Sequence, residues 1–150
     1  MREFPSEPTV LNGGHSIDDR GTVSFFNEID LTEWKRFYVV SNHQIGFIRA
    51  WHGHKHECKM VIPLTGASLV ASVKIDDWDN PKTDVPPHKF VLSADSPRSL
   101  FIPNGYANGF KTLTADAKLL FLSSSTLEES AADDYRFDWK LWNPWEIEYR

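Results

Sequence analysis

Cysteine is almost absent from this chain. Cys58 is the only cysteine among its 150 residues, which excludes an internal disulfide and a zinc site built from several thiolates. Long apolar runs are missing as well: no segment approaches the roughly 20 residues that a membrane-spanning helix requires, and the opening MREFPSEPTV lacks the apolar core of a signal peptide. These absences predict a cytoplasmic protein without a membrane anchor.

Positive charge is also in short supply. Lysine and arginine number 16 against 21 aspartates and glutamates, which gives a formal net charge of −5 and a sequence pI near 5.6. This balance argues against a broad nucleic-acid-binding surface but allows a local basic pocket for a phosphorylated small molecule. Hydrophobic residues make up 41% and charged residues 25% of the chain, as in ordinary globular proteins. We expect one domain over residues 1–150.

Short runs of β-branched and aromatic residues recur along the chain, and turn-forming residues separate them. The runs are RFYVVSN (36–42), IGFIRAWH (45–52), SLVASVKI (68–75), SLFIP (99–103) and AKLLFLSSS (117–125). Between them lie clusters of Gly, Pro, Asp and Asn, such as DDWDNPKTDVPP and IPNGYANG. This pattern predicts an antiparallel all-β sandwich or barrel rather than alternating βα units.

The stretch from residue 126 to the end differs in character. TLEESAADD predicts a short helix that Thr126 caps at its N-terminus. Trp139, Trp142 and Trp145 then recur every three residues, but Pro144 opposes a continuous helix there. We expect these tryptophans to pack over the barrel or at a subunit interface, and stacking against a ligand is the alternative.

The segment RAWHGHKHECK (49–59) places histidines on alternate positions, His52, His54 and His56, between Arg49 and Lys59. In a β-strand, residues i and i+2 share a face, so His52 and His54 point the same way and can converge on a pocket inside a barrel. Three interpretations are open: an exposed strand with solvated histidines, a metal site, or a proton-transfer site without metal.

The metal interpretation starts from a resemblance to the cupins, which are small double-sheet barrels. Gly46, five residues and then His52-Gly53-His54 match their first metal-binding motif, but Glu57 falls short of the usual offset. The second motif is similar to Pro103-Asn104-Gly105, yet Asn108 stands where the later histidine ligand belongs. Because an amide is a weak ligand beside imidazole and carboxylate, the resemblance implies the cupin fold without a tightly bound metal.

The order of motifs resembles a more specific family. IGFIRAWH, CKMV and FIPNGYANGF follow one another like the Gly-x-x-Arg-Gly-x-His, Lys-Leu-Val and Ile-Pro-x-Gly-Phe-Ala-His-Gly-Phe elements of the dTDP-4-dehydrorhamnose 3,5-epimerases. The earlier DDRG (18–21) resembles that family's Asp-x-Arg-Gly, so the resemblance covers residues 18–125. The HGHK stretch is also similar to the sugar 3,4-ketoisomerases, which are cupins with His-x-His-Lys at this position. Both families act on nucleotide-linked 4-keto-6-deoxy sugars.

The resemblance implies roles for individual residues. His52 falls on the family's catalytic base and Lys59 on its oxyanion-stabilising lysine, while a surface lysine is the alternative for Lys59. Arg49 matches a substrate-binding arginine, and Arg20 matches an early arginine that reaches the nucleotide phosphates. Imidazole is the usual base for a proton beside a ketone, and a cation stabilises the developing enolate. Since His52 and Lys59 have opposite strand parity, we expect a turn or bulge within GHKHE to re-aim the chain.

Other family positions differ in this chain. The late-strand tyrosine that serves the family as general acid is Phe121 here, and the motif histidine is Asn108, which can bind a sugar without carrying charge. A standard 3,5-epimerase is therefore not expected. A 3-epimerase would take its proton from Tyr106 or from water, unless Tyr106 only fills the core. A 3,4-ketoisomerase would use His52 and His54 in turn on one face of the sugar.

In the family, an aspartate near the C-terminus holds the base. Asp133, Asp134 and Asp138 are the candidates here. We favour Asp138, because its neighbours Phe137 and Trp139 would bury it beside an imidazole, and solvated surface carboxylates are the alternative.

These observations predict an all-β cupin barrel, a double-stranded β-helix of the jelly-roll type, with a short C-terminal helical and aromatic segment. The resemblance implies a homodimer with shared strands. The expected activity is a metal-independent epimerase or isomerase of a nucleotide-linked 4-keto-6-deoxy sugar, without a cofactor, in bacterial surface polysaccharide (LPS/O-antigen) biosynthesis. The alternatives are a non-catalytic sugar-nucleotide-binding cupin and a metal-dependent cupin enzyme.

Overall fold

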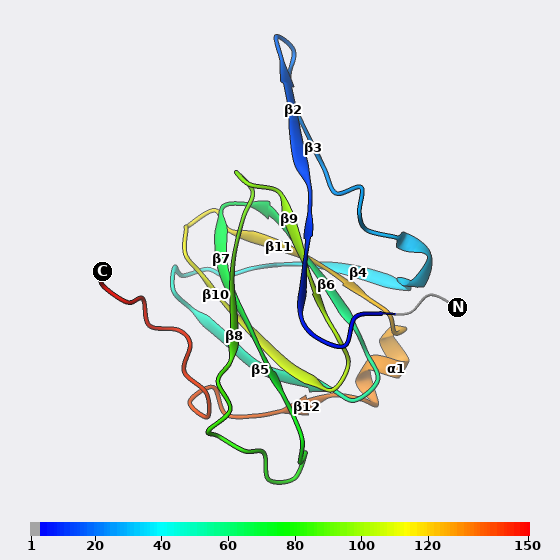
Figure 1. Cartoon of the computed structure of the whole chain (residues 1–150), viewed down its shortest axis with the longest axis vertical. Helices are drawn as coiled ribbons and strands as arrows, with labels where there is room; N and C mark the ends of the chain where they lie inside the picture. Colours follow the sequence, from blue (N-terminus) through cyan, green and yellow to red (C-terminus); the bar gives the residue numbers. More distant parts are fainter. Residues whose placement is uncertain (1–3) are drawn as a thin grey trace.

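Two five-stranded antiparallel sheets face each other and form a barrel, as the computed structural model of residues 4–150 shows (Figure 1). A separate hairpin of β2 (Gly14–Asp18) and β3 (Gly21–Phe25) extends away from the barrel at one end. This is the double-sheet cupin architecture that the sequence predicts.

The strands of each sheet come from distant parts of the chain. The first sheet has the order β1–β9–β6–β11–β4, built from β1 (Thr9–Asn12), β9 (Arg98–Ile102), β6 (Lys59–Thr65), β11 (Lys118–Ser123) and β4 (Arg36–Ser41). The second has the order β12–β5–β10–β7–β8, built from β12 (Tyr135–Arg136), β5 (Ile48–His54), β10 (Tyr106–Thr112), β7 (Ala67–Lys74) and β8 (His88–Ser93). A short 3-10 helix, η1 (Leu31–Glu33), precedes β4.

The predicted strands are present with small changes at their ends. The largest change is in the 45–52 segment, where β5 begins only at Ile48. Gly46 forms a turn before it with a φ of +79°, a backbone conformation that glycine adopts without steric cost. The histidines therefore lie in the second half of β5.

The second sheet is buried on both faces along its central strands. Its inner face joins side chains of the first sheet in the barrel core, which includes Val61, Leu100 and Phe110. Its outer face is covered by the C-terminal segment, where Trp142 and Trp145 pack around Trp51. The predicted packing of these two tryptophans over the barrel is confirmed, whereas Trp139 is 43% exposed.

The predicted C-terminal helix is α1 (Leu127–Ala131). Thr126 caps it: the hydroxyl accepts from the Glu129 backbone N–H, and the Glu129 carboxylate accepts from the Thr126 backbone N–H. This reciprocal pair satisfies two amide groups that the first turn leaves without partners. Among residues 4–150, no helix has the length and apolar character needed to cross a bilayer.

Candidate active site

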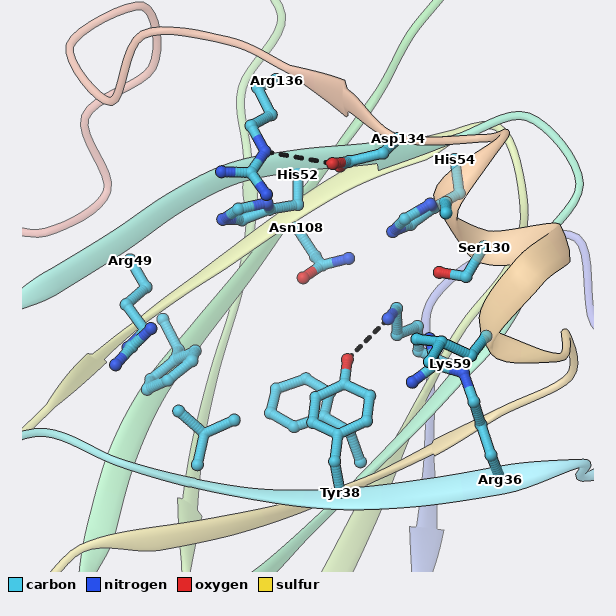
Figure 2. Close-up of a pocket in the computed structure, with 15 residues that line it drawn as sticks. Arg36, Tyr38, Arg49, His52, His54, Lys59, Asn108, Ser130, Asp134 and Arg136 are labelled. Atoms are coloured by element: carbon cyan, nitrogen blue, oxygen red, sulfur yellow. Dashed lines mark hydrogen bonds and ion pairs between the residues drawn. The ribbon is translucent and has the colours of Figure 1, made fainter.

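A cavity of about 380 Å³ opens between the two sheets beside α1 (Figure 2). Strands from both sheets and the helix contribute to its wall. The polar lining residues are Arg36, Tyr38, Arg49, His52, His54, Lys59, Asn108, Ser130, Asp134 and Arg136. The structure thus brings together five residues that the sequence singles out: His52, His54, Lys59, Arg49 and Asn108.

Three other predicted residues lie elsewhere. Arg20 is in the turn of the β2–β3 hairpin, with its side chain 86% exposed and paired with Asp18 at 2.5 Å. Tyr106 is buried in the barrel core and is not among the residues that line the cavity. Asp138 is exposed and accepts a hydrogen bond from the Lys140 backbone N–H at 2.8 Å. Within this chain, none of the three contributes to the cavity.

A bulge in β5 explains how Arg49 and His52 reach the same cavity although they are three positions apart. The register between β5 and β10 shifts between Asn108, which lies opposite His52, and Phe110, which lies opposite Arg49. A Cβ on Gly109, between them, would lie 2.8 Å from the Arg49 carbonyl oxygen, so only glycine permits this close approach.

Lys59 enters the cavity from the facing sheet. Because β5 ends at His54 and β6 begins at Lys59, the intervening residues cross from one sheet to the other. The Asp133 carboxylate holds this crossing, since it accepts hydrogen bonds from the backbone N–H groups of residues 55–57 at 2.8, 2.9 and 3.1 Å. This is the turn within GHKHE that the opposite strand parity of His52 and Lys59 requires. It orients the His52 and Lys59 side chains into one pocket.

The environment of His52 favours an uncharged imidazole. The ring is half-buried, and this burial lowers its pKa. Strand β12 pairs with β5 and sets Arg136 opposite His52, and the guanidinium lowers the pKa further, while Asp134 acts in the opposite direction. Asp134 and Arg136 pair with each other at 3.2 Å. A neutral imidazole is the form that can accept a proton.

His54 is held more firmly than His52. Its Nδ1 lies 2.6 Å from the Asp133 carbonyl oxygen and 3.0 Å from Glu57 Oε2. Among residues 4–150, by contrast, the His52 ring has no hydrogen-bond partner. The two imidazoles therefore share a wall of the cavity but differ in how they are anchored.

Tyr38 faces the histidines from β4, and sequence analysis missed it. Its hydroxyl accepts a hydrogen bond from Lys59 Nζ at 2.6 Å (Figure 2). Its ring stacks on Phe121 with centroids 5.2 Å apart and planes 4° apart. Tyr38 and Phe121 are directly paired across β4 and β11. A phenol thus lies beside the position where the resembled family has its tyrosine.

The cavity is rich in cations. Arg36 and Arg136, which sequence analysis also missed, line it together with Arg49 and Lys59. Arg49 donates to the Asn42 side chain at 2.7 Å and is therefore left with donors for a ligand. Arginines are well suited to bind phosphate and sugar oxygens. The arrangement suits an anionic ligand such as a nucleoside diphosphate sugar.

Two residues of the cupin metal motif, His54 and Glu57, are engaged in other contacts. Glu57 is buried among His54, Lys59 and Arg36, and Asn108 replaces the later histidine. In the part of the chain that the structure describes, no three His, Cys, Asp or Glu side chains gather where they could hold a metal ion.

Comparison with known proteins places this geometry in context. The sequence model of a family described as dTDP-4-dehydrorhamnose 3,5-epimerase matches residues 10–146. A search of the curated proteins finds no relative.

Several solved structures share the fold. The dTDP-4-dehydrorhamnose 3,5-epimerase from Bacillus anthracis is 23% identical with a TM-score of 0.77, covering 96% of this chain and 87% of that one. A 3,4-ketoisomerase from Helicobacter canadensis is 22% identical with a TM-score of 0.66, covering 87% and 90%. The TDP-quinovose 3,4-ketoisomerase from Campylobacter jejuni is 24% identical with a TM-score of 0.64, covering 89% and 95%.

Proposed function

The chain belongs to the dTDP-4-dehydrorhamnose 3,5-epimerase family, and from this premise we propose that it isomerises or epimerises a nucleotide-linked 4-keto-6-deoxy sugar. One observation carries the proposal. His52 and His54 lie on one wall of a cationic cavity, and a hydrogen-bonded Lys59–Tyr38 pair lies on the facing wall. A base on one side and a donor pair on the other are the two parts that enolisation beside a ketone needs.

The first step follows from these positions. His52, kept neutral by burial and by Arg136, takes a proton from the carbon beside the ketone. The electron pair of the broken C–H bond moves to the ketone oxygen, and the negative charge that develops there is stabilised by Lys59 and Tyr38. Such fixed donors act strongly because water is excluded around them. Arg49 and Arg136 are placed to bind the diphosphate that carries the sugar.

The group that returns the proton decides the product. If Tyr38 delivers a proton to the same carbon from the opposite wall, the carbon is inverted and the reaction is an epimerisation. If the proton instead goes to the neighbouring carbon on the histidine side, while His54 moves the hydroxyl proton between the two oxygens, the reaction is a 3,4-ketoisomerisation. Tyr38 across the cavity favours the first course, and the anchored His54 on the same wall as His52 favours the second.

Tyr38 replaces Tyr106 as the proposed acid, because Tyr106 is packed in the core. Asp134 replaces Asp138 as the carboxylate proposed to act on His52, because Asp134 lines the cavity and raises the pKa of His52, whereas Asp138 does not line the cavity. Asn108 lies opposite His52 and is proposed to bind the sugar without charge.

We also propose that two copies associate through the β2–β3 hairpin. The hairpin projects from the barrel (Figure 1) and exposes Ile17 and Val23. Sharing strands with a second copy would bury both side chains and bring Arg20 to that copy's cavity. The unpaired Cys58 suits the reducing cytoplasm, where surface polysaccharide precursors would be processed.

The test is proton NMR of the purified protein with dTDP-4-keto-6-deoxyglucose in deuterated water. We expect deuterium to enter one ring carbon, and the His52→Ala variant to show no such exchange. The product identifies the reaction, since an epimer and a 3-keto sugar have distinct ring-proton couplings. Absence of exchange with the dTDP sugar and with its GDP, CDP and UDP analogues would contradict the proposal and leave a sugar-nucleotide-binding protein.

A further inference from the structure

A buried carboxylate lies behind the cavity wall and is not itself part of the lining. Glu57 is 1% exposed and sits in the crossing between β5 and β6. Its two oxygens contact side chains from five different elements: His54 of β5 at 3.0 Å, Lys59 of β6 at 3.4 Å, Arg36 of β4 at 3.2 Å, Ser130 of α1 at 3.0 Å, and Ser123 of β11. Four of these, His54, Lys59, Arg36 and Ser130, are also polar groups of the cavity.

The contact with His54 determines where the ring proton lies. Nδ1 faces two oxygens, Glu57 Oε2 and the carbonyl of Asp133, and neither of them carries a hydrogen. Nδ1 must therefore be the donor, so in the neutral ring Nε2 is left with a free lone pair. A carboxylate behind an imidazole commonly fixes both the tautomer and the ring orientation in this way. Glu57 and the Asp133 carbonyl together thus leave His54 with an acceptor nitrogen on its other side.

The contact with Lys59 reaches the opposite wall. Lys59 is buried, and its ammonium donates to Tyr38 at 2.6 Å while lying 3.4 Å from Glu57 Oε1. Because the phenol oxygen accepts from the lysine, its own proton is free to point into the cavity. Burying an ammonium is costly unless an anion lies near it. Glu57 is the carboxylate that supplies this negative charge.

The charge state of Glu57 suits it to accept a hydrogen bond from His54 and to neutralise Lys59. Burial acts to raise its pKa, but the His54 hydrogen bond and the Lys59 charge outweigh this and hold the pKa well below its usual range. The carboxylate is therefore an anion whenever the protein is folded near neutral pH.

We propose that Glu57 is a positioning residue of the active site, which fixes the tautomer of His54 on one wall and anchors the Lys59–Tyr38 pair on the other. This inference rests on the proposed function, since it assigns Glu57 to the same reaction. One buried anion then orders groups that lie on opposite sides of the sugar.

The test compares Glu57→Gln with Glu129→Gln. Glutamine keeps the size of Glu57 but removes its charge and offers N–H groups where His54 and Lys59 need acceptors. We expect kcat to fall by about tenfold to a hundredfold while KM changes much less, because groups are misplaced but the phosphate-binding arginines remain. Glu129 is exposed and paired with Lys35 at 3.1 Å, so Glu129→Gln controls for loss of an ion pair without loss of turnover.

Two-bond proton–nitrogen NMR spectra of the histidine rings supply a second measurement. The wild-type His54 ring should show the Nδ1–H tautomer. In Glu57→Gln an amide N–H can donate to Nδ1 in competition with the Asp133 carbonyl, so a fraction of the Nε2–H tautomer should appear. The wild-type spectrum requires neither substrate nor a folded variant, so it can overturn the inference even if turnover is absent or Glu57→Gln does not fold. An Nε2–H tautomer in the wild type would overturn the inference, as would a folded Glu57→Gln variant whose kcat stays within about threefold of wild type.

Discussion

Strand β5 has two faces, and their side chains differ in kind. On the inner face, His52 and His54 point into the cavity toward Lys59 and Tyr38. On the outer face, Trp51 and Gly53 lie under aromatic side chains, which come from the C-terminal segment and from the loop after β7.

The two faces of β5 have different roles: the outer face holds the strand in place, and the inner face presents the proposed catalytic groups. The outer face is apolar and closely packed, so it fixes the backbone that carries the histidines. On the inner face, the buried His54 ring has partners in Glu57 and the Asp133 carbonyl, whereas the His52 ring is only half-buried. Changes on the inner side should therefore affect turnover, and changes on the outer side should affect stability.

The largest effect is expected for Tyr38→Phe, which removes the phenol that faces the inner side of β5. Product formation should fall by about 10²–10⁴-fold, the usual contribution of a positioned acid. Stability should change little, because the ring would still stack on Phe121. The measurement is product formation followed by NMR, with the melting temperature as control. A rate within about threefold of wild type would remove Tyr38 from the mechanism.

Trp51→Ala tests the outer face. The indole is fully buried and packs between Trp142 and Trp145, at centroid distances of 5.6 and 5.0 Å. Its removal leaves a large cavity and should lower the free energy of unfolding by about 3–5 kcal/mol. Urea denaturation at constant pH measures this change, and Trp139→Ala is the matched control because Trp139 is partly exposed. Equal losses for the two variants would refute the assignment of Trp51 to the core.

Gly53→Ala should cost less, about 1–3 kcal/mol of unfolding free energy, because an added methyl overpacks the same face. The new Cβ would lie 2.7 Å from the Trp78 ring and 3.2 Å from the Phe137 ring. Denaturation of Gly53→Ala alone and together with Trp78→Ala checks the cause. The cost should shrink in the double variant, and an unchanged cost would point to the backbone rather than to Trp78.

The smallest expected effect is on the pH dependence of kcat/KM, which the pKa of His52 on the inner face should control. Burial and then Arg136 lower the pKa of His52, while Asp134 raises it. Arg136→Gln removes a cation that disfavours the protonated ring, so the pKa of His52 should rise and the acidic limb of kcat/KM should move to higher pH. Asp134→Asn should move the limb to lower pH. A profile that shifts in the same direction for both variants would show that His52 does not control that limb.

Much of the fold could be predicted from local pattern. Alternation of apolar residues marks the strands, and the capping pattern at Thr126 marks α1, because both depend on neighbours along the chain. The turn between β5 and β6 could also be anticipated, since His52 and Lys59 need it to face one pocket. The family resemblance additionally located five polar residues of the cavity: His52, His54, Lys59, Arg49 and Asn108.

The rest of the site depends on contacts between distant segments. The sequence of β4 alone could not identify Tyr38 as a candidate catalytic residue. Its place in the cavity depends on its pairing with Phe121 and on its hydrogen bond from Lys59. Arg136 becomes relevant only because the two-residue strand β12 adds to the edge of β5.

The sequence by itself therefore determined a cupin barrel with His52 and His54 on one inner face, because side-chain alternation and motif order are local properties. Tertiary structure alone decided what surrounds those histidines. Glu57, which the sequence offers only as a displaced ligand of the cupin metal motif, became a buried anion only when five elements closed around it. Burial and electrostatic environment arise from three-dimensional proximity, which no single segment of the chain encodes.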